Sequence, residues 1–249
     1  MNYSRFTGML LSLAILVFSV SCNNQSSEET TATDSTTTDT MANTTTAAPA
    51  STISTTPQDM VVATHKVKDY DKWKASYDEP RHDSLRLANG MHSYVIGRGL
   101  QDPNMVLVAL KADDMNKAKS FAKDPSLKKA MQEGGVTGPP SIKFTTMVWQ
   151  DTAQISTDLR SRTTFMVKDW EKWRSYFDST RQHRLDNGVQ DRAYGHDVDD
   201  NHKVTVVVAL TDSTKAQAMW KSDDFKKRLA ESGVIGQPQR FLYRMVQRY

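Results

Sequence analysis

The order of apolar and polar positions predicts a strand and then a helix at the start of the folded part of the chain. Residues 61–67 are rich in β-branched side chains, which predicts a strand. Tyr70, Trp73 and Tyr77 then recur at helical spacing and form one apolar face. Asp69 stands just before them, where its carboxylate can accept hydrogen bonds from the free N–H groups of a first helical turn. The pattern therefore predicts a helix that starts after Asp69 and buries three aromatic rings.

The residues that follow predict three further strands and a second helical region. The first helix is expected to end at Asn89-Gly90, because glycine favours the left-handed conformation found at helix C-caps. The second helical region is expected to be interrupted near Asp124-Pro125. The strands are predicted at 91–97, 105–110 and 142–149, and the second helical region at 113–131. The order β-α-β-β-α-β is the ferredoxin-like arrangement of the α+β class.

The same series of residues recurs further along the chain. The segment Val67-Lys68-Asp69-Tyr70-Asp71-Lys72-Trp73 has its counterpart at 167–173, about 100 residues later. Later segments match in the same order, for example Asn89-Gly90 with Asn187-Gly188. This predicts a tandem duplication, with repeats at 60–150 and 161–249. Because a ferredoxin-like sheet leaves one face bare, each repeat is expected to cover the other.

Each repeat resembles the antibiotic biosynthesis monooxygenase type of domain, in the dimeric α/β-barrel superfamily. The resemblance is carried by an Asp-aromatic-x-x-Trp helix start, an Asn-Gly before the second strand, an apolar third strand, and Gly-Val-x-Gly-x-Pro before the fourth. Members of the superfamily usually dimerise through their sheets. The resemblance therefore implies a pseudo-dimeric barrel within one monomeric chain, with the repeats joined by the polar residues 150–161.

The resemblance leaves the activity open. Members include cofactor-independent quinone-forming oxygenases, haem-degrading enzymes and isomerases, and the enzymes hold their substrate between the helices and the sheet. Some of these enzymes use an Asn-Trp-His set or a Trp/Tyr/Arg set. Neither set can be placed residue by residue on this sequence, so no catalytic residue is assigned from the resemblance.

The first 59 residues have the composition of a targeting segment and a spacer. Arg5 precedes an apolar run at 9–18 that is too short to span a bilayer, which predicts a signal peptide over residues 1–21. Ser19-Val20-Ser21-Cys22 resembles a bacterial lipobox, so lipidation is expected at Cys22, with a simple cleaved signal as the alternative. Residues 22–59 are rich in Ser and Thr and predict a disordered tether. We therefore expect a lipid-anchored protein of the bacterial cell envelope, at the outer membrane, on its periplasmic or surface-exposed face.

Composition narrows the chemistry further. The formal net charge is +3, and the basic residues are interleaved with acidic ones, so nucleic-acid binding is not expected. Cys22 is the single cysteine, which excludes a disulfide within the chain and a metal cluster built on cysteines. No phosphate-binding glycine loop, Ser-His-Asp signature or cysteine nucleophile occurs, and we predict no cofactor. A His/Asp cluster at 196–202 could bind a divalent metal, but turns favour Asp in any case, and no metal ligands are assigned.

The candidate ligand-binding residues lie mainly on the first helical region of each repeat. Their aromatic members are either core or the wall of a pocket. Their Arg and His members can hold a carboxylate or phenolate, with a histidine as base, or can simply form an exposed charged helix end. The candidates on these helices are Trp73, Tyr77, Arg81, His82, Trp173, Phe177, Arg181 and His183.

A further candidate, Tyr94, lies on the predicted strand 91–97. Strict alternation places Tyr94 on the same face as His92 and Arg98, where the three could line a pocket or a solvent-facing edge. The equivalent positions in the second repeat are Gln190, Arg192 and His196. The two repeats would then differ, as expected of one active and one degenerate pocket.

Three functions remain open at this point. The first is a non-catalytic envelope lipoprotein that binds a small apolar or aromatic ligand or a protein partner, and it is preferred because no catalytic set can be resolved. The second is a cofactor-independent monooxygenase or related enzyme acting on a quinol or polyphenol. The third is a purely structural component of the envelope. A fold by itself does not choose among them.

Overall fold

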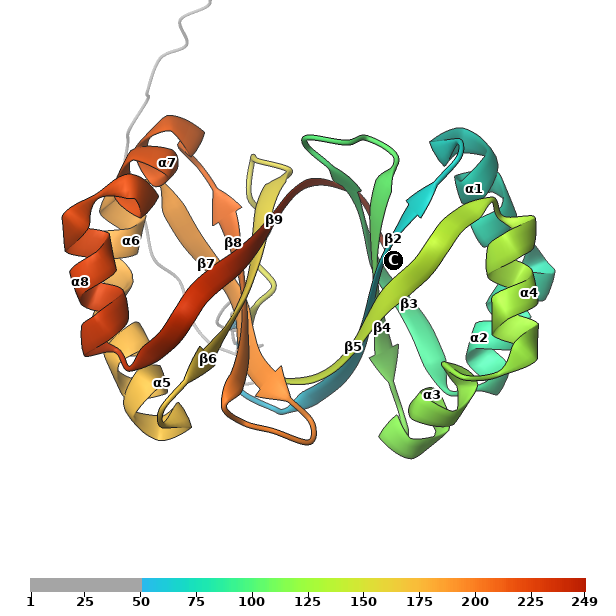
Figure 1. Cartoon of the computed structure of the whole chain (residues 1–249), viewed down its shortest axis with the longest axis horizontal. Coiled ribbons are helices and arrows are strands. Elements are labelled where there is room, and N and C mark those ends of the chain that lie inside the picture. The colour runs from blue at the N-terminus through green and yellow to red at the C-terminus, as the bar shows by residue number, and fades with distance from the viewer. Residues whose placement is uncertain (1–50) are drawn as a thin grey trace, which may run out of the picture. The chain divides into compact units, whose positions relative to one another are not determined.

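The computed structural model describes residues 51–249, so the predicted signal peptide, Cys22 and most of the predicted tether lie outside the described residues. The two halves of the described part have the same order of elements (Figure 1). The first half contains β2 (Gln58–Val67), α1 (Tyr70–Tyr77), α2 (Pro80–Ala88), β3 (Met91–Gly99), β4 (Met105–Ala112), α3 (Met115–Phe121), α4 (Pro125–Glu133) and β5 (Val136–Asp151). The second contains β6 (Leu159–Val167), α5 (Trp170–Ser179), α6 (Arg181–Asp186), β7 (Val189–Asp197), β8 (Lys203–Leu210), α7 (Ser213–Lys221), α8 (Asp223–Glu231) and β9 (Val234–Arg248).

The predicted helix starts are confirmed by their capping contacts. The carboxylate of Asp69 accepts a hydrogen bond from the backbone N–H of Lys72 at 3.1 Å, at the start of α1. Asp169 does the same for Lys172 at 3.0 Å, at the start of α5. The expected turn glycine after α2 is also present, since Gly90 has a φ of 64°.

The single long helix predicted between Asp69 and Asn89 is wrong, because this region forms two helices in each half. In the first half the break lies before Pro80, which lacks an N–H and disfavours a helical conformation for the residue before it. In the second half no proline is present. There Thr180 separates α5 from α6, and its Oγ1 donates to the carbonyl of Tyr176 at 2.9 Å. None of the helices among residues 51–249 is long and apolar enough to cross a membrane.

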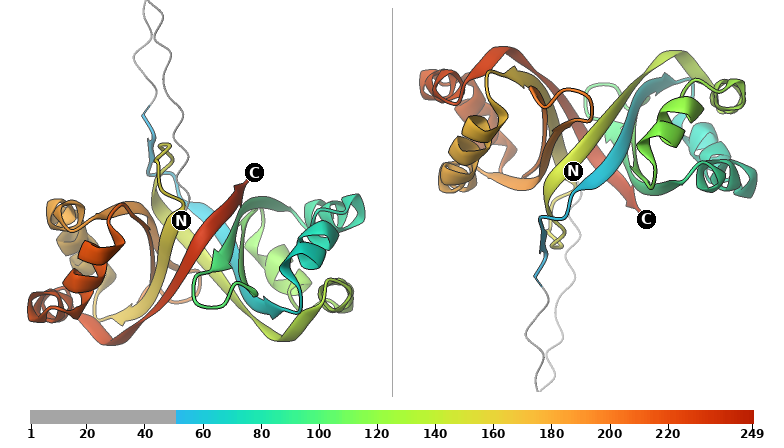
Figure 2. Two further views of the ribbon diagram at one scale, coloured as in Figure 1. Left: turned by 90° about the horizontal axis from the view of Figure 1, so that it is seen from above. Right: turned by 90° about the horizontal axis from the view of Figure 1, so that it is seen from below.

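The strands form one antiparallel sheet whose two halves are joined twice. The order is β1-β5-β2-β4-β3-β9-β6-β8-β7, and a further pairing of β5 with β7 closes β2 to β9 into a barrel. The joints are β3 with β9 and β5 with β7, so the long last strand of each half runs into the sheet of the other (Figure 2). Helices α1–α4 cover the barrel on one side and α5–α8 on the opposite side. The predicted α+β class and the barrel are confirmed.

Three boundaries differ from the expectation because strand pairing continues past the most apolar residues. The strand predicted at 142–149 extends over the whole of β5, because its two ends pair with different partners. The connection between the halves is consequently 152–158 and not 150–161. Residues 51–59, expected as the end of the tether, contain β1 (Ile53–Ser54), which pairs with the end of β5, and the first residues of β2.

The apolar core is divided by the sheet into three clusters. Two lie between the helices and the sheet, one in each half, and contain Trp73 and Trp173 respectively. The third lies inside the barrel, in the lumen, and contains Met60, Leu107 and Tyr243. The barrel therefore offers three separate apolar environments in which a ligand can be buried.

Candidate ligand cavities

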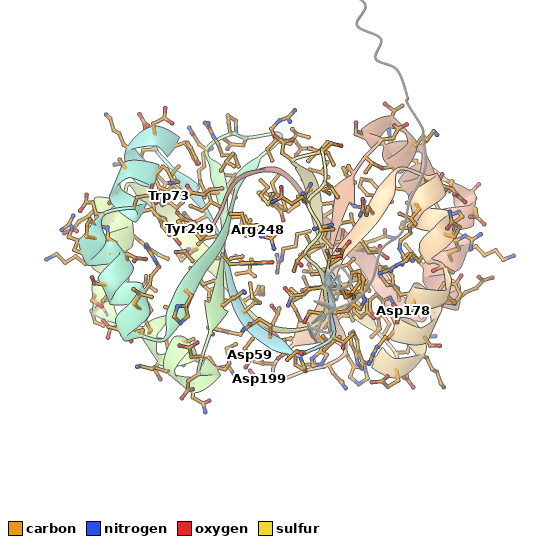
Figure 3. All side chains as sticks on the ribbon, turned by 180° about the vertical axis from the view of Figure 1, so that it is seen from behind. Asp59, Trp73, Asp178, Asp199, Arg248 and Tyr249 are labelled. Atoms are coloured by element: carbon orange, nitrogen blue, oxygen red, sulfur yellow. The ribbon has the colours of Figure 1, made fainter. Side chains whose placement is uncertain are left out.

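The first half encloses a cavity of about 110 Å³ between its helices and the outer face of the sheet. Trp73 of α1 forms one wall and is only 4% exposed (Figure 3). Of the predicted site residues, Trp73, Tyr77 and His82 all line this cavity. The side chains that complete the lining are mostly apolar, so the cavity suits an apolar or aromatic ligand.

His65 of β2 is the polar side chain that sequence reasoning missed in this cavity. It is 5% exposed, and neither of its ring nitrogens has a hydrogen-bond partner. Its ring meets the edge of Trp73, with the two centroids 5.6 Å apart. Burial lowers the pKa of His65 to about 4, so the imidazole is neutral at neutral pH. A neutral imidazole can accept a hydrogen bond or a proton from a ligand hydroxyl.

Tyr77 and Arg86 form a stacked pair at the side of the same cavity. The guanidinium carbon of Arg86 lies 3.9 Å from the centre of the Tyr77 ring. Arg86 also donates to the Tyr77 carbonyl at 3.0 Å and to Asp83 at 3.1 Å, while its Nε has no partner. The Tyr77 hydroxyl is 2.7 Å from the Oγ of Ser93, and burial raises the pKa of Tyr77. The pair places one cation beside an aromatic wall.

His82 and Arg81 are neighbours in sequence but not in the site. His82 is buried, and its Nδ1 donates to the carbonyl of Ser76 at 2.6 Å. Arg81 is 61% exposed and pairs with Glu79 and Glu133 on the surface. The structure therefore places His82 at the cavity and leaves Arg81 outside it.

The second half encloses a matching cavity, also of about 110 Å³. Trp173, Phe177 and His183, all predicted site residues, line it. The position of His65 is taken here by Phe165, whose ring lies 5.5 Å from that of Trp173. His183 is partly exposed, with its Nε2 3.4 Å from a carboxylate oxygen of Asp224. The second cavity thus lacks the buried imidazole of the first.

Two arginines of the second half, Arg184 and Arg181, share one buried carboxylate. Arg184 stacks on Phe177 at 3.5 Å and pairs with Asp191 at 2.7 Å. Asp191 is 4% exposed, so the ion pair is buried. Arg181, a predicted site residue, stacks on Trp149 at 4.3 Å and also contacts Asp191, and it does not line the cavity.

Tyr94 does not join the other predicted residues, and the predicted common face with His92 and Arg98 is wrong. The pairing of β3 with β4 shifts register between Ser93 and Val95, so the strand alternation breaks at Tyr94. Tyr94 therefore lines a third cavity inside the barrel, whereas Arg98 stacks on Tyr70 of α1 at 3.9 Å. The equivalent strand β7 shifts register at the same place, next to Arg192.

The His/Asp cluster at 196–202 is dispersed among other contacts. His196 packs edge-on against Trp170, and His202 donates to the carbonyl of Val167. Asp199 pairs with Lys119 of the first half at 2.7 Å. Within residues 51–249, no group of three or more His, Cys, Asp or Glu side chains is arranged to hold a metal ion.

No protein-family model matches the sequence, and no curated protein matches it either. Solved structures match by fold. One is a candidate monooxygenase from Fusobacterium nucleatum subsp. nucleatum, with a TM-score of 0.50 and 12% identity, covering 77% of this chain and 93% of that one. Another is an anthrone oxidase-like protein, with a TM-score of 0.50 and 13% identity, covering 76% of this chain and 92% of that one. At such identities the likeness shows the fold, a barrel of the dimeric α/β type.

Proposed function

We propose that this protein is an envelope-anchored binding protein whose helix-to-sheet cavities take small, flat, apolar or aromatic ligands. The observation that supports this is the pair of apolar cavities, each with a buried tryptophan as one wall. Each cavity also has an arginine, Arg86 or Arg184, stacked on a neighbouring ring. A flat ligand would contact the tryptophan, and the arginine would favour a polar oxygen on its rim. A protein partner that inserts an aromatic side chain is the other form of the same role.

The anchoring part of the proposal rests on the sequence. Lipidation at Cys22 would hold the mature chain at the outer membrane, on its periplasmic or surface-exposed face. The Ser/Thr-rich residues after Cys22 would then separate the barrel from the bilayer. The chain would act as a monomer, because one chain supplies both halves of the closed barrel.

A second candidate, a cofactor-independent monooxygenase acting on a quinol or polyphenol, is favoured by one observation. The neutral, unpartnered imidazole of His65 lies in the first cavity beside Trp73. It would accept a hydrogen bond from a bound quinol hydroxyl, which makes the ring more electron-rich and orients it for reaction with O₂. One oxygen atom would enter the ring and the other would leave as water. The second cavity, with Phe165 at the same place, would bind without catalysis.

Mass spectrometry of the full-length chain extracted from membranes tests the binding role and the anchor together. A mass increase that survives denaturation and disappears in Cys22→Ser would identify the acyl groups. A second increase that is lost on denaturation would identify a bound ligand. A bare, unacylated mass, unchanged after incubation with 2-naphthol and 1,4-naphthohydroquinone, would contradict the proposal and favour a structural role.

Oxygen consumption separates the enzyme from the binding protein. With 1,4-naphthohydroquinone as substrate, the enzyme would consume O₂ faster than the uncatalysed reaction, and His65→Phe would abolish this excess. Phe165→Leu is the matched control in the second cavity and should leave the rate unchanged. Binding of the quinol without excess O₂ consumption would support the binding role and contradict the enzymatic one.

A further inference from the structure

The lumen of the barrel contains a third cavity, of about 270 Å³, with two unlike walls. The first half contributes an apolar wall, which includes Met60, Val62 and Leu107. The second half contributes arginines from β6 and β7, and Arg248 of β9 lies at the same cavity (Figure 3). The lining arginines are Arg160, Arg162, Arg192 and Arg248. Apolar and cationic side chains thus line the same space.

Most of this positive charge is satisfied by the protein itself. Arg192 pairs with Asp151 at 3.1 Å, and Arg160 donates to the carbonyls of Thr157 and Leu159 at 2.7 and 3.0 Å. Arg248 donates to the hydroxyl of Tyr94 at 3.2 Å. Within residues 51–249, Asp151 is the one carboxylate that lines this cavity. It already forms an ion pair with Arg192. The lumen therefore has more cations than anions.

Arg162 is the arginine of this cavity that the protein leaves without a partner. It forms no ion pair with any described residue, and its Nε and Nη2 atoms are buried with no hydrogen bond. Those two nitrogens form the edge of a guanidinium that binds a carboxylate through two parallel hydrogen bonds. Burial lowers the pKa of Arg162, which shows that the surrounding apolar side chains disfavour the charge. An uncompensated buried cation costs stability unless an anion accompanies it.

Arg162 also separates the lumen cavity from a more polar one. It lines a second space, of about 330 Å³, together with Thr145, Thr205 and Gln239. The hydroxyl of Thr145 is buried there and has no hydrogen-bond partner. Arg162 therefore lines both spaces, and the unsatisfied hydroxyl of Thr145 lines the second one.

We propose that the lumen binds a small carboxylate with an apolar body, its carboxylate held by Arg162 and its body against the apolar wall of the first half. A carboxylate carries the single charge that the one unpartnered guanidinium can neutralise. The apolar wall selects an aliphatic or aromatic body over a sugar or a nucleotide. This site is distinct from the two helix-to-sheet cavities, because the sheet lies between them.

Calorimetric titration of the full-length chain with octanoate and with benzoate tests the site. At least one of these carboxylates is expected to bind, and octan-1-ol and benzamide, which lack the charge, are expected to bind at least about tenfold more weakly. Arg162→Met should weaken carboxylate binding at least about tenfold, and Arg162→Lys should retain part of it. Arg98→Met is the matched control, because Arg98 is an arginine of β3 that stacks on Tyr70, donates to the carbonyl of Pro103 and lines none of the three cavities.

Thermal unfolding supplies a second readout that does not depend on the choice of probe. Without ligand, Arg162→Met should raise the Tm, because it removes a buried, unpaired charge and keeps an apolar side chain of similar length. Added carboxylate should raise the Tm of the wild-type chain but not that of the variant. Absence of binding by both carboxylates at about 1 mM, or binding that Arg162→Met leaves unchanged, would overturn the proposal. His65→Phe should leave carboxylate binding intact, which keeps this result separate from the proposed function.

Discussion

The two helix-to-sheet cavities have the same tryptophan and the same stacked arginine, yet they differ at one decisive position. The first cavity has a buried His65 whose ring nitrogens have no partner, and the second has Phe165 there. The second cavity has no such imidazole. Its Arg184 is neutralised by a buried Asp191, and its Arg240 stacks on Trp220 with a buried Nε that has no partner. The two cavities therefore differ in the kind of unsatisfied group that they bury, a neutral imidazole in the first and a guanidinium nitrogen in the second.

This difference indicates which of the two cavities is the better candidate for a function. An unsatisfied buried polar group costs about 1–3 kcal/mol, so it weakens the fold unless a ligand completes it. The second half shows that the same scaffold accepts a phenylalanine at this position, so the fold does not require the imidazole. The first cavity is therefore the better candidate for chemistry, and the second the better reference for mutagenesis.

The largest expected effect comes from removing either tryptophan. Trp73→Ala and Trp173→Ala should each lower the free energy of unfolding by about 3–5 kcal/mol, because each leaves a cavity in a buried cluster. Trp173→Ala should cost more, since the Trp173 ring lies within 6 Å of four aromatic rings, those of Phe165, Trp170, Phe177 and Tyr194. Denaturant unfolding of the full-length chain measures both values. A loss below about 1 kcal/mol in either variant would show that the ring is not part of a packed core.

An intermediate effect, dependent on pH, is expected from His65→Phe, which gives the first cavity the residue of the second. Because the folded-state pKa of His65 is lowered from 6.5 to about 4, the unfolded chain binds a proton that the folded chain excludes. The wild-type chain should therefore lose roughly 3 kcal/mol through this group as the pH falls from 6.5 to about 4. The free energy of unfolding of His65→Phe should not show this part of the decrease.

Unfolding free energies at a series of pH values between these limits measure the difference. Phe165→His is the reciprocal change and should add a loss of the same sign to the second half. Parallel pH profiles for the wild-type chain and His65→Phe would show that His65 is solvated in solution, and would remove the physical basis of the enzymatic reading.

The smallest effect is expected at the paired arginines outside the cavities. Arg181→Ala should lower the free energy of unfolding by about 1 kcal/mol, because Arg181 stacks on Trp149 and contacts the buried Asp191. Arg81→Ala should leave the Tm unchanged, because Arg81 pairs only with exposed carboxylates. Thermal unfolding of the two variants side by side checks this. Equal losses would contradict the placement of Arg81 at the surface.

Most of the local structure could be predicted from the sequence because it depends on neighbouring residues. The N-caps Asp69 and Asp169, the glycine after α2 and the helix interruption at Asp124-Pro125 are local effects of backbone chemistry. The aromatic spacing on α1 and α5 predicted the apolar faces that contain Trp73 and Trp173. Only the structure shows that these faces, with His82 of α2 and His183 of α6, line cavities. Arg81 and Arg181 were left open between a ligand site and a charged helix end, because sequence spacing does not show which side of a short helix meets solvent. Neither lines the cavity of its half.

The remaining features depend on contacts between distant segments. The register shift beside Tyr94 directs that side chain towards the lumen. No residue type near Tyr94 predicts the shift. His65 occupies an ordinary position in an apolar strand, and only the packing of α1 over β2 buries it beside Trp73.

The sequence by itself determined the order of the elements, the caps that begin the helices and the aromatic faces that pack on the sheet, because these follow from spacing within a few residues. The tertiary structure alone decided that β5 and β9 cross into the opposite halves. This crossing places Arg162 in a lumen where its Nε and Nη2 atoms are buried without a hydrogen-bond partner. The physical reason is that closure of the barrel pairs segments that are far apart in the sequence, such as Val95 with Arg248 and Thr145 with Asp197. Burial and charge balance arise only from that closure.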